Sequence, residues 1–441
     1  MNKNDFQTAR TALGVFVCGA LLGVGLGCST SSRTANEPAA TFDAAASAAP
    51  ATNANSGRTP AASMNRITRR EVVPNGVTTA SGLTVPRGFQ VNVFADGLEN
   101  PRRITFAPGA TPRKYDVFVS ESRANRIRVL RDNNGDGKAD ERFTFAEGLS
   151  QPYGIAFHPG GWVYVANTDG VVRFPYRTGA TSAGGDSQFI SKLTQGGYNQ
   201  HWTRNLLFSR DAKKLYVTVG SSCNTCEEDD PQRAAISVMN PDGTARRVFA
   251  SGLRNPVGMA WRPGTNELWT VVNERDRLGD DIPPDYLTLV RDGEFYGWPY
   301  AYATLDGKIV PDPEYGSRNA QKVRQTRPWT VPVQAHSAAL GVAFYPQQAA
   351  SGAKAFPAEY SGDAFLAFHG SWNRSAKTGY KIVRVDFQNA RPTAVTDFVR
   401  GFQNGGAVWG RPVDVQIAPD GSLLFTDDDG GKIWRVSYSG K

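Results

Sequence analysis

The stretch VGMAWRPGTNELWTVVNE, residues 257–274, contains two apolar, strand-like runs separated by a Pro-Gly turn. The first run is continuous and the second alternates, which is typical of neighbouring strands in one antiparallel sheet. Similar units recur along the chain at intervals of roughly 50 residues, and longer ones where loops are inserted near 282–335 and 346–362. The last large apolar residue of the first run aligns at six positions: Phe106, Phe157, Phe208, Trp261, Phe344 and Ile417.

Repeats of this length with three or four strands each are the signature of a β-propeller, and a β-sandwich would not explain six similar units. The last unit stops after three strands, at Tyr438, whereas residues 89–98 form a strand that belongs to no unit of its own. We therefore expect an all-β, six-bladed β-propeller over residues 81–441. Its N-terminal strand should close the last blade and remove an exposed sheet edge.

The first 28 residues have the organisation of an export signal. Lys3 and Arg10 precede an apolar run, and small residues precede Cys28. GLGC resembles a bacterial lipobox, although Gly25 stands where Leu or Val is usual, so lipidation of Cys28 is predicted. The alternative is an uncleaved membrane anchor, because the apolar run is at the short limit for a spanning helix.

Residues 29–80 are expected to be a disordered tether rich in Ala, Ser and Thr, because such a segment buries too little apolar surface to fold. The protein is therefore expected in the periplasm or cell envelope, as an exported and membrane-anchored lipoprotein. About half of the net charge of +8 lies in the first 70 residues, so the propeller itself is nearly balanced. This distribution gives no indication of a nucleic-acid partner. Six blades can close within one chain, so a monomer is sufficient.

Polar side chains lie at the starts of the predicted inner strands, where the loops of a propeller gather around one end of its channel. His201, Arg254, Asn255 and Arg411 occupy such positions. Two arginines on facing blades predict a planar, anionic ligand, because guanidinium groups bind carboxylates in a bidentate manner. The alternative is that each arginine pairs with a local carboxylate such as Asp414. His336 also begins a repeat, and whether it faces the channel stays open.

Several motifs carry a family resemblance: HWTRNLLF (201–208), GLRNPVGMAW (252–261), HGSWNR (369–374) and WGRPVDVQIAPDG (409–421). They resemble the soluble quinoprotein sugar dehydrogenases of the glucose/sorbosone dehydrogenase family, from about residue 86 to 440. The resemblance implies a propeller that binds pyrroloquinoline quinone (PQQ) over its channel, with Ca²⁺ beside it. It also implies oxidation of an aldose or related sugar, with electrons passing to an external carrier or to the quinone pool.

The resemblance assigns roles to individual residues. His201 would take the proton from the anomeric hydroxyl as hydride leaves C1, and backbone carbonyls of Glu274 and Arg275 would hold the active-site Ca²⁺. A lysine that glucose-oxidising members carry is absent, and His369 or Arg374 would take its place. The Gly-Pro of the Ca²⁺-binding stretch and an aromatic residue near Gln334 are absent as well. The implied cofactor-binding residues are Arg254, Asn255, Asn273, Arg411, His369 and Arg374.

The segment DNNGDGKAD, residues 132–140, has oxygen-bearing side chains at the spacing of a calcium loop. A structural Ca²⁺ site is expected there, with Phe143 where an EF-hand would need Glu. An Asp/Asn/Gly hairpin turn needs the same residue types and is the alternative. The four candidate ligands are Asp132, Asn134, Asp136 and Asp140.

Cys223 and Cys226 are the only cysteines outside the leader, and in an oxidising compartment we expect them to form a disulfide. Two other function classes remain open at this point. A Ca²⁺-dependent lactonase would need carboxylates and amides around a central metal, and a non-catalytic envelope propeller would bind glycan or peptide. The set His201, Arg254 and Arg411 favours the dehydrogenase over both.

Overall fold

The computed structural model describes residues 67–195, 201–347 and 354–440. They belong to one compact unit, Ser63–Lys441. The predicted export signal, Cys28 and the first part of the predicted tether lie outside the described residues. None of the described helices is long and apolar enough to cross a membrane.

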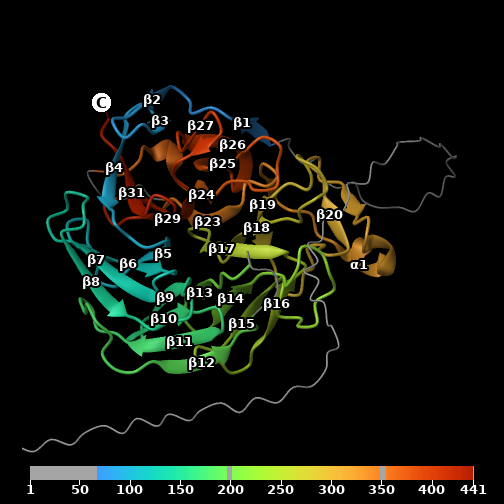
Figure 1. The fold of residues 1–441 in the computed structure, drawn as a ribbon, viewed down its shortest axis with the longest axis horizontal. Helices are drawn as coiled ribbons and strands as arrows, with labels where there is room; N and C mark the ends of the chain where they lie inside the picture. Colours follow the sequence, from blue (N-terminus) through green and yellow to red (C-terminus); the bar gives the residue numbers. More distant parts are fainter. Residues whose placement is uncertain (1–66, 196–200, 348–353, 441) are drawn as a thin grey trace, which may run out of the picture. The chain divides into compact units, whose positions relative to one another are not determined.

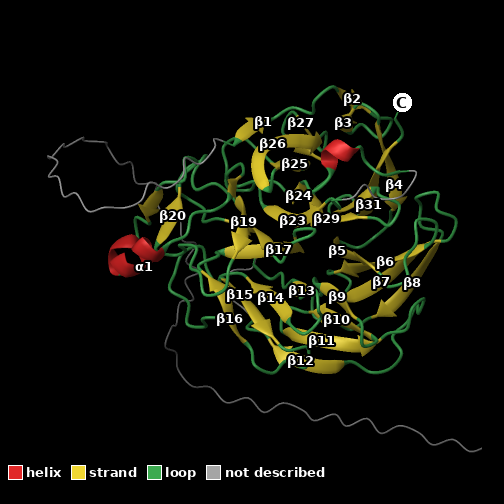
Figure 2. Cartoon of the chain, turned by 180° about the vertical axis from the view of Figure 1, so that it is seen from behind, coloured by secondary structure: helices red, strands yellow, loops and turns green. Residues whose placement is uncertain are grey.

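Six sheets are arranged around a common centre, as a six-bladed propeller (Figure 1). Strands make up nearly all of the regular structure in the part of the chain that is described (Figure 2). The strands of each blade are given from the innermost outward. Blade 1 consists of β5 (Pro101–Phe106), β6 (Tyr115–Glu121), β7 (Arg126–Asp132) and β8 (Glu141–Ala146), and blade 2 of β9 (Ile155–His158), β10 (Trp162–Ala166), β11 (Gly170–Pro175) and β12 (Gln188–Lys192). Blade 3 consists of β13 (Leu206–Phe208), β14 (Leu215–Val219), β15 (Ala235–Met239) and β16 (Arg247–Ser251).

The remaining blades contain the insertions expected from the sequence. A hairpin of β20 (Ala301–Ala303) and β21 (Ile309–Pro311), with the short helix α1 (Ala320–Gln325), separates the last two strands of blade 4. Blade 4 consists of β17 (Asn255–Trp261), β18 (Leu268–Asn273), β19 (Tyr286–Val290) and β22 (Val331–Pro332). Blade 5 consists of β23 (Ala339–Phe344), β24 (Ala364–Phe368), β25 (Lys381–Gln388) and β26 (Arg391–Val399), and blade 6 of β29 (Pro412–Ile417), β30 (Leu423–Asp427), β31 (Lys432–Tyr438) and β4 (Phe89–Ala95).

The innermost strands pack closely against one another around the ring. At two of these contacts a side chain would not fit: a Cβ on Gly258 would lie 2.7 Å from the carbonyl oxygen of Leu340, and one on Gly341 would lie 2.7 Å from the Cα of Asp414. Glycine at the starts of β17 and β23 therefore allows the backbones of adjacent blades to approach. This close approach brings the starts of the inner strands together at one end of the ring.

The predicted closure of the last blade is confirmed. β4 pairs antiparallel with β31, with Phe89 opposite Tyr438 and Val91 opposite Val436. Phe89 is buried in an aromatic cluster with Phe356, Tyr360 and Phe398, so the closing strand is also fixed by apolar packing.

One predicted boundary is wrong. The tether was expected to reach residue 80, but β1 (Thr68–Arg70) pairs in parallel with the outer strand β26, and β2 (Gly76–Thr78) pairs with β3 (Thr84–Pro86). The strand residues of this segment are exposed, and it is held by backbone pairing. Composition did not reveal this, because a strand added to a sheet edge needs few apolar side chains.

Candidate cofactor and active site

A polar cavity of about 310 Å³ lies at the end of the ring where the inner strands begin. Its walls come from five blades, because the start of each inner strand and the end of its antiparallel neighbour meet at the same end of a blade. The lining residues that bear polar or aromatic side chains are Arg102, His201, Trp202, Thr203, Arg254, Asn255, Asn273, Glu274, Asp276, Asp285, His336, His369, Trp372 and Arg411.

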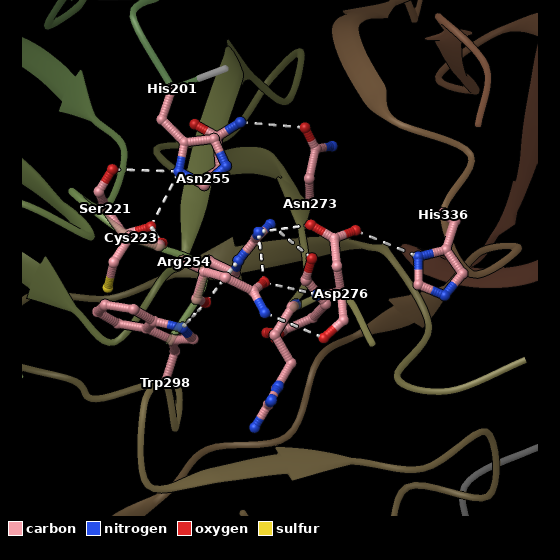
Figure 3. A network of polar contacts seen from close by, with 12 residues as sticks. His201, Ser221, Cys223, Arg254, Asn255, Asn273, Asp276, Trp298 and His336 are labelled. Atoms are coloured by element: carbon pink, nitrogen blue, oxygen red, sulfur yellow. Dashed lines mark hydrogen bonds and ion pairs between the residues drawn. The ribbon is translucent and has the colours of Figure 1, made fainter. Parts of the chain in front are cut away.

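His201 is 4% exposed, and its ring contacts Ser221 on the loop after β14. Its Nδ1 lies 3.1 Å from the carbonyl oxygen of Ser221 and 2.9 Å from the Ser221 Oγ (Figure 3). The Ser221 hydroxyl donates its own proton to the carbonyl oxygen of Cys223. Both oxygens therefore accept from Nδ1, which carries the ring proton and leaves the lone pair of the neutral ring on Nε2. Burial and then the charge of Arg254 hold the pKa of His201 well below 6.5, so the ring is neutral.

Gly220 provides the space that His201 and Asn255 occupy. A Cβ at this position would lie 2.3 Å from the Asn255 Oδ1 and 2.9 Å from the His201 Cβ. We expect Gly220→Ala to lower the free energy of unfolding by about 1–3 kcal/mol and to displace both side chains. Urea denaturation measures the first effect. Gly184→Ala is the control, because its nearest atom would lie at an ordinary 3.4 Å.

Arg254 is fixed by a set of acceptors on two loops, and one of them is a carboxylate. Its guanidinium donates to the carbonyl oxygen and side chain of Asn224, to the carbonyl oxygen of Glu274 and to the Asp276 carboxylate, at 2.6–3.0 Å. The side chain is 2% exposed. The predicted alternative of a local carboxylate partner therefore holds for Arg254, although Asp276 and not Asp414 is that partner.

Asp276 also links Arg254 to His336. One Asp276 oxygen lies 3.5 Å from the His336 Nδ1, and the His336 Nε2 donates to the carbonyl oxygen of Gly279 at 2.8 Å (Figure 3). Burial alone would lower the pKa of His336, but the contacts with Asp276 and Gly279 outweigh it and raise the pKa. The cavity therefore places a neutral imidazole on one wall and, on another, an imidazole whose pKa is raised.

Two further carboxyl groups of this wall are fully enclosed. Burial raises the pKa of Glu274 to about 7 and that of Asp285 to about 6. Asp285 accepts hydrogen bonds from the backbone N–H groups of Glu274 and Ala338, which ties the end of β18 to the start of β23.

The opposite wall is built around Asp428. Its carboxylate accepts from the His369 Nε2 at 2.9 Å and from the Arg102 guanidinium. Arg102 also lies over the ring of Trp202, 5.2 Å from its centroid. Arg411 donates to the carbonyl oxygens of His369 and Gly370, and its backbone N–H donates to Asp427, so its charge has no carboxylate partner among the described side chains.

The cavity fits a planar anion. Arg102, Arg254 and Arg411 line it from three blades, and the indole of Trp202 offers a flat apolar face. Among the described residues, Arg411 pairs with carbonyl oxygens and with no carboxylate side chain. Two buried polar atoms in its walls, the Asn255 Oδ1 and the Arg102 Nε, have no hydrogen-bond partner in the described structure. Buried polar groups are rarely left unpaired, so these atoms indicate a missing polar ligand.

Two of the predicted site residues lie outside the cavity. Arg374 donates to the carbonyl oxygen of Asp280 and to the Asp281 carboxylate and lines a separate pocket. Arg275 pairs with Asp312 and Glu314, on the insertion of blade 4. Of the two proposed replacements for the family's lysine, only His369 faces the cavity. Sequence could not exclude Arg374, because its orientation depends on a loop 94 residues away in the chain.

Both predicted calcium sites contain hydrogen bonds within the described structure. The carbonyl oxygen of Glu274 accepts a hydrogen bond from the Arg254 guanidinium, so a Ca²⁺ ion there would share this oxygen with a cation. In the loop after β7, the Asp132 carboxylate accepts from the backbone N–H groups of Asn134, Gly135 and Gly137. That pattern is a hairpin turn, the alternative considered above. Asn134 and Asp136 cap backbone N–H groups in the same way, and Asp140 accepts from Asn133.

The predicted disulfide between Cys223 and Cys226 is present. Sequence reasoning missed Arg102, Asp276, Asp285, Trp202 and Trp372. Arg102 could have been found, because it lies in the first turn-to-strand segment of its blade, two residues after Asn100, as a charged residue at the start of an inner strand. The acidic residues do not occupy a repeated position in the sequence. Asp285 lies 11 residues after Glu274 in the chain, and only the folded loop brings its carboxylate to the backbone N–H of Glu274.

The chain is therefore a six-bladed propeller with a polar cavity, lined by a buried histidine and three arginines, that is suited to binding a ligand. The chain belongs to the TrAA12-like family, whose model matches residues 83–439. An uncharacterized protein of Borreliella burgdorferi is 32% identical over 81% of this chain and 91% of its own length. A pyrroloquinoline quinone-dependent sugar dehydrogenase of Hypocrea jecorina is 25% identical, over 51% of this chain and 58% of that protein. The resemblance to quinoprotein sugar dehydrogenases is thereby confirmed.

Solved structures show the same fold. A Trichoderma reesei carbohydrate-active enzyme of family AA12 superposes with a TM-score of 0.69 at 21% identity, covering 83% of this chain and all of that one. The PQQ domain of pyranose dehydrogenase from Coprinopsis cinerea superposes with a TM-score of 0.67 at 20% identity, covering 84% of this chain and all of that domain.

Proposed function

We propose that this protein is a PQQ-dependent dehydrogenase that oxidises an aldose or a related sugar at C1, with His201 as the base. The observation that carries the proposal is the cavity itself, which sets a neutral imidazole with its lone pair on Nε2 among three arginines. The named functions of the relatives support it.

Each wall of the cavity has a part in this reaction. Arg411, Arg102 and the Asn255 side chain would hold the carboxylates and carbonyls of PQQ, and bound PQQ supplies a quinone that accepts hydride. The His201 Nε2 takes the proton of the hydroxyl group on the carbon that is oxidised, and the Ser221 oxygens stabilise the imidazolium that forms. Calcium is not part of this proposal, because the Glu274 carbonyl oxygen is already bonded to Arg254.

The test is a binding and activity measurement on the full chain. PQQ is titrated into the protein, and reduction of an artificial dye is then followed across a panel of aldoses, sorbosone and simple alcohols. Saturable PQQ binding with sugar-dependent dye reduction is expected. If PQQ does not bind, the proposal is wrong. A panel of lactones assayed for hydrolysis tests the lactonase alternative.

The geometry gives little support to a lactonase. Among the described residues, the only group of three His, Cys, Asp or Glu ligand atoms close enough for one ion is Cys223, Cys226 and Glu228, and two of these are joined as a disulfide. Within the described residues, an ion held by three or more carboxylate or imidazole side chains therefore lacks its ligand set.

We also propose that the protein is exported to the cell envelope, tethered through Cys28, and works as a monomer with an external electron acceptor. The disulfide supports an oxidising compartment. Labelling with a radioactive fatty acid and its loss in Cys28→Ser tests the anchor.

A further inference from the structure

The loop that follows β14, residues 221–228, lies directly behind the site and is closed by the Cys223–Cys226 disulfide. Both cysteines are half-buried. The backbone N–H of Ser222 donates to the Glu228 carboxylate at 2.6 Å, which holds the two ends of the loop together. The loop contacts both halves of the candidate site.

Asn224, which lies between the two cysteines, holds Arg254 and Asp276. Its side-chain oxygen accepts from an Nη of Arg254 at 2.9 Å and from the backbone N–H of Asp276 at 2.8 Å. Its side-chain amide donates to the Asp276 carbonyl oxygen at 3.2 Å. Its own carbonyl oxygen accepts from the Arg254 Nε at 3.0 Å and from the Trp298 Nε1 at 3.1 Å.

The neighbouring residues hold His201. The Ser221 Oγ and carbonyl oxygen face the His201 Nδ1, and the Ser221 hydroxyl is oriented by the Cys223 carbonyl oxygen at 2.6 Å (Figure 3). The backbone N–H of Ser221 in turn donates to the carbonyl oxygen of Arg254 at 2.8 Å. One short loop thus sets the position of the base and of a cofactor-facing arginine.

We propose that this disulfide loop is a positioning device for the site, with Asn224 as its central residue, and that reduction of the Cys223–Cys226 bond reversibly lowers activity. The inference rests on the function proposed above. The bond is half-buried, so a small dithiol or phosphine reaches it. The reductant supplies two electrons, two protons convert both sulfurs to thiols, and the reductant is itself oxidised. Without the cross-link, the segment from Cys223 to Cys226 gains conformational freedom and the Asn224 contacts are no longer held in register.

The first experiment compares the oxidised and reduced full-length protein. The protein is treated with tris(2-carboxyethyl)phosphine and the reductant is removed before PQQ is added. PQQ affinity is expected to fall about tenfold or more, as for the loss of hydrogen bonds to a charged group. Reoxidation with a disulfide should restore the affinity. The Cys223→Ser/Cys226→Ser protein should have the lower affinity permanently and should not respond to the phosphine.

The second experiment needs neither PQQ nor sugar. The chain has four histidines, so the imidazole resonances of protein with isotope-labelled histidine can be followed through a pH titration. In Asn224→Ala, and in the reduced wild type, the His201 titration is expected to move to higher pH, because Arg254 is no longer held nearby. Asn240→Ala, on an outer hairpin of blade 3, is the matched control.

Two results would overturn the proposal. One is an unchanged His201 titration and a PQQ affinity within about twofold after reduction. The other is an Asn224→Ala protein that only unfolds more easily, with both readouts unchanged, which would make the loop structural. If no sugar is oxidised by any form but the His201 titration moves, the loop positions the site and the proposed function fails separately.

Discussion

Replacing His201 by alanine is expected to lower kcat for the best sugar substrate about a thousandfold, within the range found when a general base is removed. PQQ affinity should change less than tenfold, because the arginines and Asn255 remain. The measurement is dye-coupled steady-state kinetics at saturating PQQ, with PQQ affinity determined separately.

His158→Ala is the control for this experiment. His158 lies in the turn after β9, bonded to the carbonyl oxygen of Ala212, and does not line the cavity. It should retain wild-type kinetics. A loss of less than tenfold in His201→Ala would show that another group takes the proton.

Replacing Arg254 by methionine is expected to weaken PQQ binding about tenfold or more, since a cation that lines the cavity is lost and the Asp276 carboxylate keeps its negative charge there. The pH profile should change as well. The neutral form of His201 is the active base, and burial followed by Arg254 lowers its pKa well below 6.5. In the wild type, kcat/KM should therefore stay constant through pH 6.5 and fall only at lower pH. In Arg254→Met this fall should begin at a higher pH.

Arg262→Met is the matched control. Arg262 belongs to the same blade and is 5% exposed, but it pairs with Glu267 at the other end of β17. Its loss should lower stability and leave the pH profile unchanged. An acid limb that does not move in Arg254→Met would show that Arg254 does not control the charge of His201.

The fold could be predicted because each blade repeats the same local pattern. Phe157, Trp261 and Ile417 lie at or next to the ends of their inner strands, as the alignment of repeats required. The closing strand could be predicted for a related reason, since the last repeat was one strand short. Residues 67–80 could not, because their strands are held by backbone bonds that leave no apolar pattern.

The site could be predicted only where its residues occupy a repeated position. His201, Arg254, Asn255 and Arg411 precede inner strands, and all four line the cavity. Arg374 lies on a long loop, where sequence does not fix the direction of a side chain. The calcium loop stays a prediction, because the side chains that bind Ca²⁺ also cap backbone N–H groups in a tight turn, as Asp132 does here.

The pairing of β4 with β31 also has a consequence for the order of events in folding. Ser439 donates to the carbonyl oxygen of Gly88 across 351 residues of chain, so blade 6 cannot be completed until nearly the whole polypeptide has left the ribosome. Contacts of such long range are slow to form. During synthesis the first five blades can assemble one after another. The sides of blades 1 and 5 that pack against blade 6 stay exposed until blade 6 is complete. A chain in that state still lacks a finished ring, and only the pairing of β4 with β31 completes it.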